Sequence, residues 1–175
     1  MENKTEITNA AMSVQQNDTG EEVYIFPATP AQNRFWLLDQ LAPGDPALNI
    51  PLAARLNGRL DRALLEQSIN ELIARHEALR TTFRTWDGEV VQVIHAKLPT
   101  SLEWKDVSDL PESAREARVG ELLIKEAGKG LVISTGPVFR AGIIQLREDR
   151  HVLYLTAHHI VCDGWSSGVI LRELA

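Results

Sequence analysis

The chain has 175 residues, of which 44% are hydrophobic and 24% are charged, and its formal net charge is −6 at pH 7. This composition is that of a single globular domain and excludes a wholly disordered chain. The negative charge and the lack of a Lys/Arg cluster argue against a nucleic-acid surface, because phosphates need clustered cations.

The N-terminal residues 1–22 are polar, and we interpret them as a flexible leader. They lack the apolar core of a signal peptide, and no stretch approaches the ~18 apolar residues of a membrane span. Cys162 is the only cysteine, which excludes internal disulfides and a Cys-rich zinc site. We therefore expect a cytoplasmic protein with neither membrane nor nucleic-acid partners.

The first predicted element is a helix in FPATPAQNRFWLLDQL. Thr29 and Gln32 have capping-box spacing, and Pro30 occupies the first helical position, where its missing N–H has no cost. Pro43-Gly44 ends this helix. Residues that share one face at helical spacing are Ala31, Phe35 and Leu38.

A helix flanked by strands follows. Asp61 is a good N-cap for a helix whose apolar stripe runs to Leu79. The turn Asp87-Gly88 predicts a β-hairpin. The strands expected here are Asn49–Leu56, Thr81–Trp86 and Glu89–His95.

The rest of the chain predicts further strands and helices. Asp109 and Glu112 have cap spacing for a helix from about Pro111 to Ala127, and the pattern VILRELA after Gly168 begins another. The strands expected are Leu102–Val107, Val138–Arg147 and His151–Ala157. Helices and strands without strict alternation predict an α+β fold, an open α/β sandwich.

Residues 155–168 read LTAHHIVCDGWSSG, with His158 and His159 adjacent at a strand end. Neighbouring side chains on a strand point to opposite faces, so these two histidines make a poor ligand pair for one metal ion. No H-x-x-x-H pattern or carboxylate cluster nearby supplies further zinc ligands. We therefore expect no metal site.

If the strand reaches His159, that residue continues an apolar row and faces the interior or a cleft. A free imidazole titrates near ~6.5 and could accept a proton there. His158, on the opposite face, would orient the loop. Gly164 allows the backbone to approach a substrate closely, with its N–H toward a developing oxyanion. The residues alone leave two interpretations open, an acid–base site and a structural histidine at a strand end.

A third interpretation makes Cys162 a nucleophile served by a histidine. Asp163, its neighbour, is acidic and would not lower the pKa of the thiol. We therefore expect a small buried cysteine.

Three segments carry a family resemblance. HHIVCDGWS resembles the His-His-x-x-x-Asp-Gly motif of the condensation domains of nonribosomal peptide synthetases, a shorter form of which occurs across the chloramphenicol-acetyltransferase-like acyltransferases. TPAQNRFWLLDQL resembles the first motif of the family, and RHEALRTTF (Arg75–Phe83) its second. The resemblance covers roughly residues 24–175, and the first motif is similar to domains that join an L-configured donor to an L-configured acceptor.

The resemblance implies a chloramphenicol-acetyltransferase-like lobe, with a mixed sheet flanked by helices, that forms amide bonds. The amine of an aminoacyl group on a downstream carrier protein attacks the acyl thioester of an upstream carrier. The carriers bring the phosphopantetheine arms, so no cofactor is bound directly. The catalytic positions are His159, His158 and Gly164, and His159 either takes the proton of the amine or orients that amine.

The resemblance also assigns supporting residues. Asp163 is expected to be a structural carboxylate that pairs with an arginine, Arg80 first and Arg75 second, so that Asp163→Ala would cause misfolding. Trp165 and Ser166 are expected to line the substrate tunnel.

Because the chain ends soon after His159, we expect residues 23–175 to be an N-terminal lobe without its C-terminal lobe, and little activity from this lobe alone. The partners implied are donor and acceptor peptidyl carrier proteins, the missing lobe and an adenylation domain. The alternatives are a non-catalytic carrier-docking lobe, an epimerisation-type domain and a coenzyme A-dependent acyltransferase of the same fold.

Overall fold

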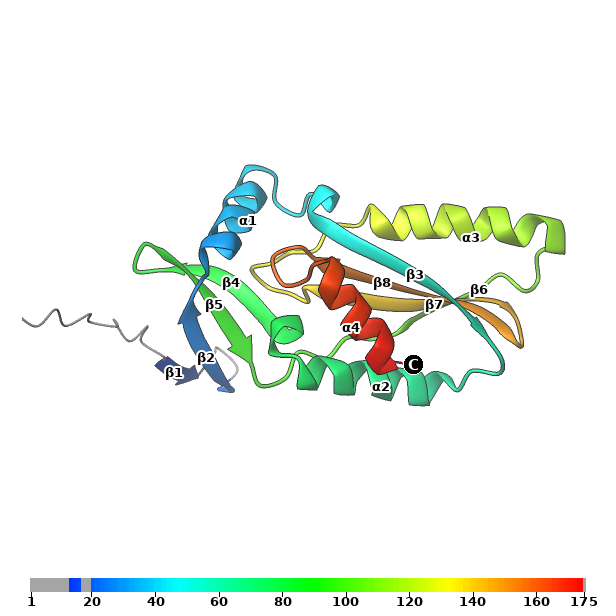
Figure 1. Cartoon of the computed structure of the whole chain (residues 1–175), viewed down its shortest axis with the longest axis horizontal. Coiled ribbons are helices and arrows are strands. Elements are labelled where there is room, and N and C mark those ends of the chain that lie inside the picture. Colours follow the sequence, from blue (N-terminus) through cyan, green and yellow to red (C-terminus); the bar gives the residue numbers. More distant parts are fainter. Residues whose placement is uncertain (1–12, 17–19, 175) are drawn as a thin grey trace, which may run out of the picture.

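A computed structural model describes residues 13–16 and 20–174 of the chain. The fold is α+β, as predicted (Figure 1). The strands are β1 (Ser13–Gln16), β2 (Glu22–Pro27), β3 (Asn49–Asn57), β4 (Thr81–Trp86), β5 (Glu89–His95), β6 (Glu103–Asp106), β7 (Phe139–Arg147) and β8 (Arg150–His158). The α-helices are α1 (Pro30–Leu41), α2 (Arg62–Arg75), α3 (Glu112–Ala127) and α4 (Gly164–Leu174), and the 3₁₀ turns are η1 (Pro46–Leu48) and η2 (Glu77–Arg80).

The strands form two sheets. The smaller sheet has the order β1-β2-β5-β4 and is antiparallel, and the hairpin between β4 and β5 turns at Asp87-Gly88, as predicted. The larger sheet has the order β3-β8-β7-β6, in which β6 runs parallel to β7 and the other pairs are antiparallel. The expectation of a mixed sheet is therefore confirmed.

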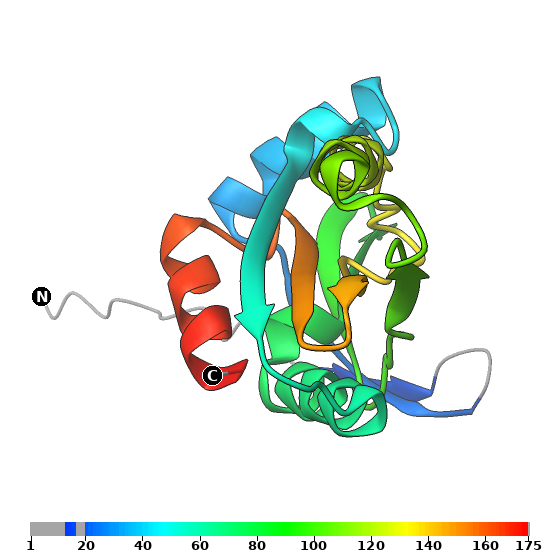
Figure 2. The same ribbon diagram turned by 90° about the vertical axis from the view of Figure 1, so that its right-hand side faces the viewer.

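Helices cover both faces of the larger sheet, so every residue of β8 after Arg150 is buried. Alternate residues of β8 pack in two separate clusters. Leu153, Leu155 and Ala157 lie with residues of α2 and α4, whereas Val152 and Tyr154 lie with residues of α3. Figure 2 shows α2 and α3 on opposite sides of the sheet. The strand that ends at His158 is thus packed between helices on both sides.

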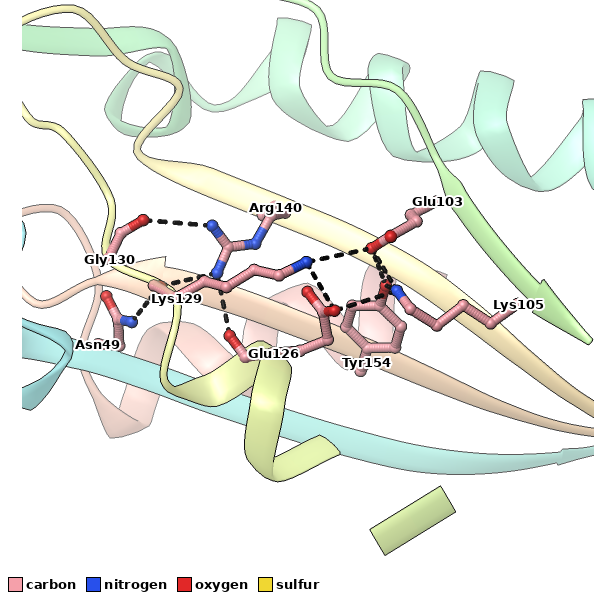
Figure 3. A network of polar contacts seen from close by, with 8 residues as sticks. All are labelled: Asn49, Glu103, Lys105, Glu126, Lys129, Gly130, Arg140 and Tyr154. Atoms are coloured by element: carbon pink, nitrogen blue, oxygen red, sulfur yellow. Dashed lines mark hydrogen bonds and ion pairs between the residues drawn. The ribbon is translucent and has the colours of Figure 1, made fainter. Parts of the chain in front are cut away.

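A polar network lies on the α3 side of this sheet (Figure 3). The carboxylate of Glu126, whose side chain is 2% exposed, forms ion pairs with the Nζ atoms of Lys105 at 3.1 Å and Lys129 at 2.7 Å. The Tyr154 hydroxyl accepts a hydrogen bond from Lys105 and donates one to Glu103. The buried charge of Glu126 is therefore compensated within the network, which joins α3 to β6 and β8.

The loops after α1 and α3 meet backbone to backbone. A Cβ atom at Gly130 would lie 1.9 Å from the carbonyl oxygen of Gly44, closer than atoms can approach. Gly44 itself has a φ of +71°, a left-handed conformation that favours glycine. Both glycines are required for this contact.

Four local predictions differ from the structure. Ser13–Gln16 pair with β2 instead of belonging to a flexible leader, while the rest of residues 1–19 lies outside the described ranges. Helix α3 begins after Pro111 with no side-chain cap, so the Asp109 cap is wrong. Helix α4 begins at Gly164, five residues before the pattern VILRELA, which starts at Val169. The three residues expected to share one face of α1 differ in exposure, because Phe35 is half-buried whereas Ala31 and Leu38 are exposed.

None of the helices in residues 20–174 is both long enough and apolar enough to cross a membrane.

Candidate active site

The two adjacent histidines have opposite environments. His158 is the last residue of β8 and is 1% exposed, whereas His159 follows in a turn and is exposed. The turn after β8 and the start of α4 lie on the α1 side of the molecule (Figure 1). The strand extends one residue beyond the predicted Ala157 and pairing ends at His158 opposite Asn49, so the condition that it reaches His159 is not met.

His158 has a defined tautomer. Its Nδ1 accepts a hydrogen bond from the Ile160 N–H at 3.1 Å, so in the neutral imidazole the proton is on Nε2. Burial lowers the pKa of His158, and the carboxylate of Asp39 counteracts this only in part. Among the described residues its Nε2 has no hydrogen-bond partner. His158 thus acts as a neutral brace that fixes the turn.

His159 is held in place through its backbone and through one face of its ring. Its N–H donates to the carbonyl of Leu48 at 2.8 Å. Its imidazole stacks on Phe35 of α1, with ring centroids 4.6 Å apart and an angle of 23° between the planes. In the described part of the chain no side chain hydrogen-bonds to its ring nitrogens, so they are free to meet a substrate.

Sequence reasoning missed two residues of α1 that lie at this site. Phe35 stacks on His159, and Asp39, one helical turn later, is buried and acts electrostatically on His158. Asp39 also accepts a hydrogen bond from the Gly44 N–H at 3.2 Å. Their spacing of four residues puts both on one side of the helix, and a charged residue in an apolar stretch was the available signal.

Asp163 is the N-cap of α4. Its Oδ1 accepts the Ser166 N–H at 2.8 Å and the Ser166 hydroxyl at 2.6 Å. These bonds hold the pKa of Asp163 below its usual range. Gly164, the first residue of α4, is exposed and has open space around it. The capping bond therefore orients the N-terminus of α4 beside the histidines.

The predicted pairing of Asp163 with Arg80 or Arg75 is wrong. Arg80 donates to the carbonyl of His95 and pairs with Glu77 at 3.3 Å. Arg75 pairs with Glu173 on α4 at 3.2 Å. Asp163 is exposed and gains local hydrogen bonds from Ser166, so it has no buried charge that would require an arginine.

Trp165 and Ser166 line a small apolar pocket of about 190 Å³ between α4 and η2. Trp165 is 82% exposed. Whether they line a substrate tunnel stays a prediction. Cys162, in the wall of the same pocket, is buried, and burial raises the pKa of its thiol. A nucleophilic role for it is therefore disfavoured.

The second motif contacts α4 through a different cluster. The Nε2 of His76 lies 2.9 Å from the carboxylate of Glu173, which also pairs with Arg75. This cluster ties the C-terminal end of α4 to the end of α2.

Over residues 13–16 and 20–174, no group of three or more His, Cys, Asp or Glu side chains is arranged to hold a metal ion.

Comparison with known proteins gives a consistent result. Residues 22–175 match the family model described as the condensation domain. One component of the linear gramicidin synthase of Brevibacillus parabrevis is 45% identical over 148 residues, which cover 85% of this chain and 2% of that protein. Surfactin synthase subunit 2 of Bacillus subtilis (strain 168) is 34% identical over 183 residues, which cover 98% of this chain and 5% of that protein.

Solved structures agree at the level of the fold. The starter condensation domain of the rhizomide synthetase RzmA superposes with a TM-score of 0.79 at 22% identity, over 86% of this chain and 38% of that chain. The chain thus spans a small part of the length of these curated relatives and 38% of that solved chain.

Proposed function

The chain belongs to the condensation domains of nonribosomal peptide synthetases, and from this premise we propose that it is the N-terminal lobe of a domain that forms amide bonds between carrier-bound substrates. The substrates are an acyl or peptidyl thioester on an upstream carrier protein and an aminoacyl thioester on a downstream carrier.

The proposed reaction is an acyl transfer. The nitrogen of the downstream amine attacks the upstream thioester carbonyl, a C–N bond forms, and the C–S bond breaks. The amine loses one proton, and the departing sulfur of the upstream arm gains one. His159 receives the proton from the amine or holds the amine in place for attack, and the phosphopantetheine arms belong to the substrates.

The single observation that supports this role most is the contrast between the two histidines. His158 is buried, is hydrogen-bonded through Nδ1 and has a lowered pKa, so it remains neutral. His159 is exposed and keeps its ring nitrogens available at a point that two elements of the fold hold fixed. A base or orienting group needs this combination of access and fixed position.

Gly164 is the proposed oxyanion contact. Its N–H is at the N-terminus of α4, where backbone N–H groups favour negative charge. The Asp163 carboxylate accepts from the N–H groups of Ser166 and Trp165, which leaves the Gly164 N–H for a substrate.

We propose that the exposed His159 faces a second lobe, so that this chain alone has the catalytic residues but only one wall of the substrate tunnel. Trp165 and Ser166 would lie on that wall. The proposed partners are donor and acceptor carrier proteins and an adenylation domain. The proposed location is the cytoplasm.

The test uses the chain joined to the C-terminal lobe of a condensation domain, with donor and acceptor carriers loaded beforehand. Product amide on the acceptor carrier is measured by mass spectrometry. We expect His159→Ala to reduce the rate by about 10²–10⁴-fold. The matched control is Arg118→Ala on α3, remote from the histidines, which should keep the rate of the wild type.

An unchanged rate in His159→Ala would remove the catalytic assignment and favour a lobe that only docks carriers. The chain without a second lobe should give almost no product. Efficient condensation by the isolated chain would contradict the proposal of an incomplete tunnel.

A further inference from the structure

We propose that Phe35 is a positioning residue for His159, a role that rests on the proposed function and assigns part of the first motif to the active site. The stack of the two rings, with centroids 4.6 Å apart and planes at 23°, is the juxtaposition that carries this inference.

The stack is needed because no side chain among residues 13–16 and 20–174 holds the His159 ring by a hydrogen bond. Its backbone is fixed by the N–H bond to Leu48, but it lies in a turn and its imidazole is exposed. An exposed side chain can occupy several staggered rotamers, which would point the ring nitrogens in different directions. Contact of one ring face with Phe35 selects one of these orientations, while the nitrogens at the ring edge remain accessible.

Phe35 is itself anchored well enough to serve as a reference surface. It is half-buried and packs against a cluster formed by Phe83, Ile133, Val138 and Ile160. The helix that carries it has a complete capping box, in which Thr29 and Gln32 each bind the backbone of the other. Ile160 follows His159 directly, so the turn and the phenyl ring share one apolar support.

An aromatic ring suits this task better than an aliphatic side chain of similar size. Stacked aromatic rings at this separation attract each other beyond the burial of their area, and a flat surface restricts the tilt of the imidazole. A small misplacement of a group that must meet an attacking amine is costly, since about 1 Å can reduce a rate by about 10²-fold.

The chain offers a matched control for Phe35. Trp36 is the next residue, is also half-buried, and packs against the same cluster, but in the described residues its ring does not stack on His159. Replacing Trp36 by Leu should perturb the packing of α1 as much as replacing Phe35 by Leu, without releasing the imidazole.

The first measurement is the proton NMR signal of the His159 ring in the 175-residue chain. A stacked phenyl ring shifts the carbon-bound protons of the imidazole upfield. We expect this shift to be lost in Phe35→Leu and kept in Phe35→Trp and Trp36→Leu. An upfield shift that survives in Phe35→Leu would overturn the stack.

The second measurement is condensation by the chain joined to a C-terminal lobe. We expect Phe35→Leu to lower kcat by about 10- to 100-fold with little change in KM for the acceptor carrier, and Phe35→Trp to restore most of kcat. Equal losses in Phe35→Leu and Trp36→Leu would overturn the positioning role. If only Phe35→Leu retains full activity, the positioning role fails and the proposed function stands. If His159→Ala also retains full activity, the proposed function fails as well.

Discussion

The carboxylate of Asp163 and the backbone and hydroxyl of Ser166 form the N-cap of α4, with contacts of 2.8 Å and 2.6 Å. The residue is exposed, so its role is to start a helix and thereby to place Gly164 beside the histidines.

The cap predicts a mild effect for Asp163→Ala. We expect a drop in Tm of about 2–4 °C and a folded protein, with Asp163→Asn close to the wild type because Asn caps equally well. The hydrogen bonds from Ser166 lower the pKa of Asp163, so its contribution is present above about pH 4 and is lost as the pH falls through the lowered value. Thermal unfolding by circular dichroism at pH 7 and pH 3 checks both points. Wholesale misfolding of Asp163→Ala at pH 7 would instead indicate a buried ion pair.

The network around Glu126 predicts a large loss of stability. Glu126→Ala removes the buried carboxylate shared by Lys105 and Lys129 and leaves them only the exposed Glu103, so we expect a cost of about 1–3 kcal/mol. The control is Glu121→Ala on the same helix, because Glu121 is 66% exposed and its pair with Arg118 is worth about 1 kcal/mol or less. Guanidinium unfolding gives both free energies, and similar values for the two variants would contradict a structural role for the network.

Two glycines predict opposite effects of the same substitution. A Cβ at Gly142 would lie 2.2 Å from the ring of Tyr154, so Gly142→Ala displaces a buried tyrosine and should cost about 1–3 kcal/mol or more. Gly120 lies inside α3 with open space around its Cβ position, so Gly120→Ala should add about 0.5–1 kcal/mol of stability. Both free energies come from denaturant unfolding. A neutral Gly142→Ala would show that Tyr154 can move.

Buried and half-buried histidines predict that acid destabilises the fold. Burial lowers the pKa values of His95, His151 and His158, so the unfolded chain takes up protons near pH 6.5 that the folded chain does not. The free energy of unfolding should therefore be largest above about pH 6.5 and fall as the pH decreases below it. The slope of the free energy of unfolding against pH gives the number of protons taken up on unfolding. His151→Phe should reduce this number by up to one, as measured by urea unfolding between pH 7.5 and 5.5. An unchanged slope would mean that His151 is protonated in the folded state.

Local signals predicted most of the fold. The strands β4 and β5 begin and end where the sequence pattern places them, because the Asp87-Gly88 turn and the alternation of side chains act over few residues. The capping box at Thr29 was equally visible. Strand β1 was missed because a short segment with three polar residues and Val14 acquires strand conformation only through pairing with β2, which the sequence does not display.

The site was harder to predict because its geometry depends on contacts distant in the chain. The motif placed His158, His159 and Gly164 together, but strand parity could not reveal that pairing would end at His158. The stack of Phe35 on His159 joins residues 124 positions apart, and nothing in the helical pattern of α1 marks that contact. We expected a distant arginine as the partner of Asp163. The actual partner, Ser166, lies three residues away, with the spacing of an ordinary N-cap.

The contact between Gly44 and Gly130 has a consequence for recombining related synthetases. With no side chain between the two loops, the position of α1, and with it Phe35 and Asp39, depends on a glycine almost ninety residues downstream. A crossover between relatives at any point between Gly44 and Gly130 takes the two contacting loops from different parents. A chimera that inherits a larger residue at either position would tilt α1 away from the histidines even though every motif remained intact.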